Sequence, residues 1–158
     1  MTPEKLHLAV NHVPMIALAA LLLPMVYALL AKQKVLLVLL LAMTCVLGAA
    51  TIILMQSGEN AEHRMEDGEL AGPPYTEQIH DLIEEHEERA EVTAISSYAT
   101  ALLAAIAIAL AFYRLEWSVW VSWVVVVGMV VTTALAMWTS QAGGLIRHPE
   151  LRATSTAG

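Results

Sequence analysis

The chain has 158 residues, of which 58% are hydrophobic, and its mean hydropathy is +0.62, which excludes an ordinary soluble domain. Its formal net charge is −7, because 15 Asp and Glu outnumber 8 Lys and Arg. Nucleic-acid binding, which needs clustered Lys and Arg, is therefore excluded as well.

Length and composition predict an all-α, polytopic membrane protein: one domain over residues 1–158, built as a bundle of four transmembrane helices. A hydrocarbon core about 30 Å thick needs about 20 apolar residues in a helix. Four apolar segments meet that length, over residues 6–31, 35–55, 92–113 and 117–141. We expect the complete helices at about 4–31, 35–56, 77–113 and 117–141, with a loop over 57–76 and a C-terminal tail over 142–158.

The first predicted helix carries polar residues near its start. In the run Asn11-His12-Val13-Pro14, the proline has no N–H to bond back, so the carbonyl of Val10 is free for another partner. His12 lies at a depth where an ionisable side chain indicates function. His7 lies one turn before Asn11, so these two share a face that differs from that of His12.

The second helix is followed by an acidic connection. Twelve of the 15 acidic residues lie between Glu59 and Glu91, so the negative charge is a property of this region. His63 and His80 belong to it, and we expect both to lie on a solvated acidic surface. The sole cysteine, Cys45, lies inside the second apolar run and cannot form an intrachain disulfide.

The third helix is expected to begin early, at about Glu77, with Thr76 as its N-cap. Helical periodicity places one group of its residues on a common side and turns a second group largely toward water. The first group is Ile79, Leu82, Ile83 and His86, and the second is Glu84, Glu85, Glu87 and Glu88.

Small and weakly polar residues recur at helical spacing in each of the last three helices. In membranes such stripes let helices approach closely, so they predict the interior of the bundle. Extending the stripe of the third helix outward by one turn leads from Ala90 to His86, which should point toward the bundle axis. The stripes are Thr44, Gly48, Thr51 and Met55, then Ala90, Thr93, Ser97 and Thr100, then Gly128, Thr132, Ala136 and Ser140.

The segment after the fourth helix contains Gly143 and Gly144, followed by Arg147 and His148. Paired glycines break helices, so we expect the chain to fold back here. That turn would bring Arg147 and His148 over the outer mouth of the bundle.

Two short turns predict the orientation in the membrane. Lys32-Gln33-Lys34 joins the first two helices and Arg114-Leu115-Glu116 joins the last two, on one side of the membrane. Short loops that contain Lys and Arg stay in the cytoplasm. We therefore expect a bacterial inner-membrane protein with two cytoplasmic turns, a periplasmic acidic connection and both termini in the periplasm.

Four short segments carry a family resemblance. They are His7 with Asn11–Pro14, Gly58-Glu59, His86-Glu87 and Gly143–Glu150. In them the chain resembles a group of small bacterial four-helix membrane proteins of unassigned function. It is more distantly similar to histidine-headed predicted membrane proteins that are sometimes joined to Rieske or cytochrome modules. The resemblance implies a redox setting and names no reaction.

The leading functional hypothesis is an electron-transfer protein or redox-complex subunit that binds b-type haem. Two neutral imidazoles from different helices would ligate the iron, as in other four-helix bundles. His12 and His86 are the preferred ligands, His148 and His7 the reserves, with Asn11 beside them and Arg147 facing the propionates. Its expected partners are other membrane or periplasmic redox proteins and quinol. The hypothesis favours an electron carrier or binding subunit over a stand-alone enzyme.

Two alternatives stay open. In the first, the periplasmic face binds Cu, Zn or Fe through imidazole and carboxylate ligands. The residues that matter more in this case are His63, His80, Glu59, Glu62 and Glu84, and Met55 would favour copper. In the second, the chain is a cofactor-free accessory subunit of a larger membrane complex. The metalloprotease motif HExxH and the haem-attachment motif CxxCH are both absent from the sequence.

Overall fold

The structure is a computed structural model and describes residues 13–67 and 76–147. Within these residues all regular structure is helical: α2 (Val13–Leu30), α3 (Lys34–Glu66), α4 (Glu77–Tyr113) and α5 (Leu115–Arg147). Each of these four helices is long and apolar enough to cross a membrane. The chain is thus an all-α four-helix protein whose helices fit a lipid bilayer. The expected start of the first helix, over 4–12, lies outside the described residues.

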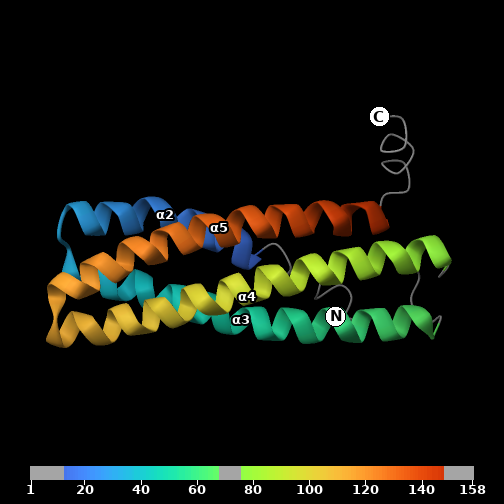
Figure 1. Ribbon diagram of the computed structural model, residues 1–158, viewed down its shortest axis with the longest axis horizontal. Helices are drawn as coiled ribbons and strands as arrows, with labels where there is room; N and C mark the ends of the chain where they lie inside the picture. Colours follow the sequence, from blue (N-terminus) through green and yellow to red (C-terminus); the bar gives the residue numbers. More distant parts are fainter. Residues whose placement is uncertain (1–12, 68–75, 148–158) are drawn as a thin grey trace.

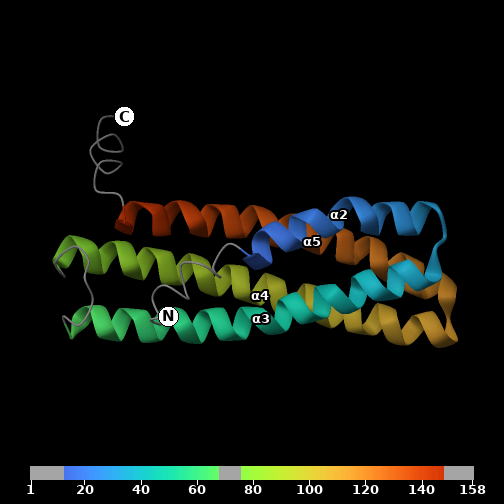
Figure 2. The ribbon, with the colours of Figure 1, turned by 180° about the vertical axis from the view of Figure 1, so that it is seen from behind.

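The helices form a bundle in which each one packs against two neighbours, in the ring order α2, α3, α4, α5, and α4 and α5 share the most extensive contact. Figures 1 and 2 show α3, α4 and α5 side by side along the bundle, whereas the described part of α2 covers one half of its length. We call the end with residues 31–33 and 114 the turn end. The opposite end, formed by residues 57–66, 77–91 and 141–147, is the polar end.

The two connections at the turn end are tight. Lys32 has a φ of 54° and lies in the left-handed region. Its N–H donates to the carbonyl of Leu29 at 3.3 Å, and the N–H of Gln33 donates to that of Ala28 at 2.9 Å, which is a Schellman ending of α2. Arg114 alone separates α4 from α5, so both pairs of helices reverse direction within a few residues.

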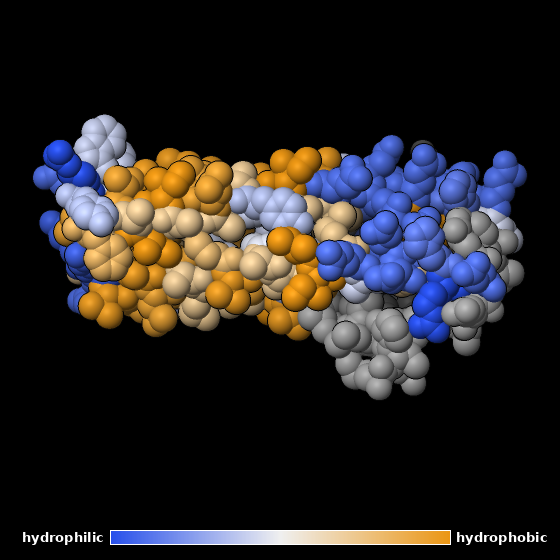
Figure 3. Space-filling view, turned by 90° about the horizontal axis from the view of Figure 1, so that it is seen from below, coloured by the Kyte–Doolittle hydropathy of each residue, from blue (hydrophilic) through white to orange (hydrophobic). Residues whose placement is uncertain are grey.

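The surface between the two ends is apolar. Side chains such as Leu23 (81% exposed) and Val35 (86% exposed) are open to the surroundings, as are Phe112 and Trp120. Figure 3 shows this hydrophobic band, with hydrophilic residues gathered beyond it, most of all at the polar end. A soluble protein would cover so large an apolar patch, whereas an exposed band of this kind fits a lipid bilayer.

Inside the band, small residues let the helices approach closely. A Cβ added at Gly48 of α3 would lie 2.4 Å from the Cβ of Ala101 of α4. A Cβ added at Gly128 of α5 would lie 2.6 Å from Oγ1 of Thr100. These glycines belong to the stripes that predicted the bundle interior, and the prediction of an interior position is confirmed for both.

Two expected helix ends are wrong. The second helix was expected to end near 56, but α3 continues to Glu66, so residues 57–66 of the expected loop are helical. This segment contains no proline, and Gly58 does not interrupt the helix. The α4 helix has the expected bounds, and Thr76 caps it by accepting a hydrogen bond from the N–H of Ile79 at 3.3 Å.

The fourth helix was expected to end near 141, with a fold back at the paired glycines. Instead α5 continues through Gly143 and Gly144 to Arg147. The reason is packing, since a glycine inside a helix also allows a neighbour to approach the backbone, and Gly143 does this for a side chain of α4. The expected fold back of Arg147 is therefore wrong, and His148 lies outside the described residues.

Candidate functional site

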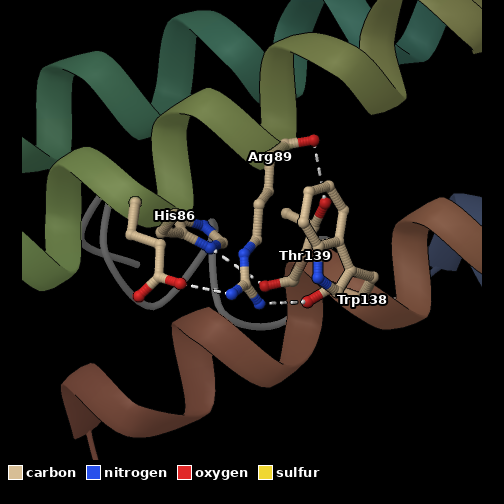
Figure 4. Close-up of polar contacts among 5 residues, drawn as sticks. His86, Arg89, Trp138 and Thr139 are labelled. Atoms are coloured by element: carbon tan, nitrogen blue, oxygen red, sulfur yellow. Dashed lines mark hydrogen bonds and ion pairs between the residues drawn. The ribbon is translucent and has the colours of Figure 1, made fainter.

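His86 lies in the contact between α4 and α5 at the polar end, as its helical phase predicted. Its ring nitrogen Nδ1 is 3.1 Å from the carbonyl oxygen of Thr139 on α5, and Figure 4 shows the imidazole directed at the backbone of α5. The imidazole also packs on Gly143, where an added Cβ would lie 3.0 Å from Cε1 of His86. Gly143 thus makes room for the histidine ring.

The protonation state of His86 follows from its surroundings. A carbonyl oxygen accepts hydrogen bonds, so Nδ1 must be the donor of the bond to Thr139. Burial, and to a lesser extent the charge of Arg89, lowers the pKa of His86 below its usual value of 6.5, although the bond to Thr139 opposes the shift. At neutral pH the ring is therefore uncharged, and its lone pair is on Nε2.

Arg89 fixes the same contact one turn further along α4. Its guanidinium lies over the Trp138 ring, 4.5 Å from the centroid, donates to the carbonyl of Trp138 at 3.2 Å and pairs with Glu85. Figure 4 shows His86 and Arg89 together, facing Trp138 and Thr139. The hydroxyls of Thr93 and Thr139 are 2.8 Å apart and both lie within 3.0 Å of the Arg89 carbonyl. These contacts join α4 to α5 on the helical turns that follow His86.

A cavity of about 100 Å³ lies beside His86 in the bundle interior. All four helices line it, α2 through Pro14, Met15 and Leu18. Every residue of the three predicted stripes except Gly128 is in its wall. The wall includes nine hydroxyl-bearing residues: Thr44, Thr51, Thr93, Ser97, Thr100, Thr132, Thr133, Thr139 and Ser140. Among the described residues that line it, His86 is the titratable one.

A second titratable contact lies between α3 and α4. Glu87, the residue next to His86, forms a side-chain hydrogen bond with Glu62 of α3. Burial, this bond and the charges of Glu62, Glu59 and Glu91 raise the pKa of Glu87 to about 7. Glu87 was expected largely to face water, but it is half-buried, because the continuation of α3 to Glu66 brings Glu62 beside it.

The other predicted site residues are distributed unevenly. His63, His80, Glu59 and Glu84 are exposed, and Glu62 is half-buried against Glu87. Met55 lines the cavity, and Arg147 is the last residue of α5. His7, Asn11, His12 and His148 lie outside the described residues. Over residues 13–67 and 76–147, no group of three or more His, Cys, Asp or Glu side chains could hold a metal ion.

Sequence reasoning missed Thr139 and Arg89. The stripe predicted for the fourth helix passes through Ala136 and Ser140, whereas the hydrogen bond to His86 comes from the neighbouring position 139. Residues spaced three or four apart share a face of a helix, so Ala136, Thr139 and Gly143 form one row. Following this row would have identified the residues that face His86. No pattern in the sequence could have paired Arg89 with Trp138, because they are far apart along the chain.

Comparison of the chain with models of protein families, with curated proteins and with solved structures gives no match. The geometry at His86 therefore carries the functional argument by itself.

Proposed function

We propose that this chain is a membrane-bound redox-complex subunit that holds its redox ligand beside His86, in the cavity near the polar end of the bundle. The observation that carries the proposal is the orientation of the imidazole. Nδ1 donates to the Thr139 carbonyl at 3.1 Å, so Nε2 keeps its lone pair. His86 also lines the cavity. Histidines that bind metals and ligands are commonly fixed through their other nitrogen in this way.

The proposal includes a direction in the membrane. Lys32, Lys34 and Arg114 at the turn end favour a cytoplasmic position for that end. The polar end, the acidic connection and both termini are then periplasmic in a bacterial inner membrane, so redox partners in the periplasm or the membrane can reach it. In a Cys45→Ser background, a cysteine at Asn60 should react with a membrane-impermeant maleimide in intact spheroplasts, and one at Gln33 should not. The reverse pattern contradicts this orientation.

The size of the cavity bears on whether haem could be the ligand. A b-type haem would take His86 as one axial ligand and would need a second imidazole, for which His12, His7 and His148 are the expected sources. Cofactor pockets generally measure about 300 Å³ or more. The cavity beside His86 measures about 100 Å³, so the described residues as packed do not fit a porphyrin. A smaller redox ligand fits this site better.

The experiment is to purify the chain anaerobically, extract it with organic solvent and search for a redox-active molecule. The wild type should carry such a ligand, and His86→Asn should lose it. Asn can still donate to the Thr139 carbonyl but lacks the Nε2 acceptor. His80→Asn, at an exposed histidine of the same helix, is the matched control and should retain the ligand.

An absorption spectrum and metal analysis of the same samples test the alternatives. A haem Soret band that depends on His86 would mean that the helices separate to admit a porphyrin, and it would correct the choice of a smaller ligand. If no redox-active molecule is extracted, and neither haemin, metal ions nor quinol changes thermal stability, the proposed function is wrong.

A further inference from the structure

The cavity beside His86 is far smaller than a porphyrin needs and is closer in size to a single six-membered ring. An apolar cavity of about 150 Å³ holds a benzene molecule. The present cavity, about 100 Å³, is smaller, so a ring enters it only if side chains of the wall shift. Its wall differs from an apolar one because hydroxyls line it on α3, α4 and α5. A ring that enters this space therefore meets hydrogen-bonding groups, and their polarity decides which ring is preferred.

Most of these hydroxyls have already used their hydrogen. Six of the nine have the carbonyl oxygen of the residue four positions earlier in their own helix at 2.8 to 3.2 Å, so the hydrogen of each has an acceptor within the protein. They are Thr44, Thr51, Thr93, Thr100, Thr133 and Thr139. A hydroxyl has one hydrogen and two lone pairs, so each of the six can still accept a hydrogen bond while its own hydrogen is used within the protein.

Two further hydroxyls bond to other side chains. Ser97 is 3.0 Å from the hydroxyl of Thr51, and one of the two hydroxyls donates to the other. Thr132 lies 2.8 Å from the hydroxyl of Ser96. Ser140 is the remaining hydroxyl of this wall, without a hydrogen-bond partner among the described residues. The wall as a whole offers many acceptors and few donors.

His86 has the same polarity. Its Nδ1 hydrogen is directed to Thr139, and the neutral ring presents a lone pair on Nε2. A bound molecule that carries O–H groups could donate to Nε2 and to the threonine oxygens. A molecule with carbonyl oxygens instead of O–H groups would meet mainly acceptors. Its oxygens would lose their hydrogen bonds to water and gain few in return, which costs free energy.

We propose that the cavity binds the head group of a lipid-soluble quinol, and that it selects this reduced form over the corresponding quinone. A quinol ring bears two hydroxyl donors, whereas the quinone ring bears two carbonyl acceptors. Its apolar tail matches the lipid that surrounds the hydrophobic band. This inference rests on the proposed function, because it names the ligand of the same site.

The test compares decylubiquinol with decylubiquinone, measured anaerobically by calorimetry with the purified chain in detergent. The quinol should bind about tenfold more tightly or better, since one net hydrogen bond corresponds to about one power of ten in affinity. His86→Asn should weaken quinol binding about tenfold and leave quinone binding unchanged, and His80→Asn should change neither. Thermal unfolding of both variants shows that they are folded.

Equal affinity for the two forms, or tighter binding of the quinone, overturns the inference, and the wild-type comparison does so without any variant. If neither form binds, but a haem or metal binds in a manner that depends on His86, the inference fails and the proposed function stands. If no redox ligand binds at all, both fail.

Discussion

The two sides of α4 at the polar end hold adjacent titratable residues in opposite ways. His86 faces α5 and is fixed by the Thr139 carbonyl and by Gly143, which are both uncharged. Glu87 faces α3 and shares a hydrogen bond with Glu62, beside Glu59 and Glu91. Burial lowers the pKa of His86 and raises that of Glu87. On both sides the packing of α4 thus favours the uncharged form of the buried group.

This difference makes the two contacts sensitive to opposite changes in pH. Acid charges His86 and acts on the contact between α4 and α5, whereas alkali charges Glu87 and acts on the contact between α3 and α4. Gly48 of α3 and Gly143 of α5 allow a second comparison, because each lacks a side chain at a point where a residue of α4 packs closely against it. Substitutions can therefore break each side of α4 separately.

The largest effect is expected for Gly48→Leu on the α3 side. Its Cβ would lie 2.4 Å from that of Ala101, so α3 and α4 must move apart along the bundle. We expect the free energy of unfolding to fall by about 3 kcal/mol, the upper part of the range for overpacking. Unfolding in mixed micelles with increasing dodecyl sulfate measures it. Gly144→Leu is the control, with nothing within 4 Å of the added Cβ, and an equal loss there would contradict the prediction.

A smaller effect is expected on the α5 side for Gly143→Ala. The added methyl would lie 3.0 Å from the His86 ring, which must shift. Gly144→Ala adds the same methyl with nothing within 4 Å and should benefit from the better helix propensity of alanine. We expect Gly143→Ala to be about 1 kcal/mol less stable than Gly144→Ala in the same micelle titration. Equal stabilities would show that His86 does not pack on Gly143.

The sequence was sufficient for the helices and for much of the interior. Apolar runs longer than the bilayer core predicted four helices, because a backbone in lipid must satisfy its own hydrogen bonds. The stripes through Thr51, Ser97 and Ala136 predicted the bundle interior, because small residues mark close helix contacts in membranes, and these residues line the cavity there. The same phase, extended from Ala90, placed His86.

The polar end was harder to predict because water can satisfy a backbone there. Residues 57–66 are polar, so hydropathy ended the helix too early, although nothing in them prevents α3 from continuing. Gly143 has the sequence signature of a helix end, and its role in making room for His86 depends on a residue of another helix. The pair of Glu62 and Glu87 was missed for the same reason, since it exists only if α3 reaches that far.

Acid should destabilise the contact between α4 and α5 by charging His86. A lowered pKa means that the folded state favours neutral His86, so this contribution to stability is present above pH 6.5 and is lost as pH falls through the folded pKa. Arg89 adds to the effect, because it repels the imidazolium, and Thr139 and Gly143 of α5 carry no charge. The thermal midpoint of the wild type should fall more steeply below pH 6.5 than that of His86→Asn. Parallel curves would contradict it.

The smallest effect is expected for Glu87→Gln, and it has the opposite sign. A pKa raised from 4.5 to about 7 means that protonated Glu87 stabilises the fold below pH 4.5 and that this contribution is lost as pH rises to about 7. Glutamine cannot ionise, yet its amide can donate to Glu62. At pH 8 we therefore expect the variant to be more stable than the wild type by about 0.5 kcal/mol, a small value because solvent screens the carboxylates. Glu84→Gln, at an exposed carboxylate of the same helix, should show no such gain. If the two variants respond alike, the effect is one of overall charge, and the contact between Glu62 and Glu87 does not control this side of α4.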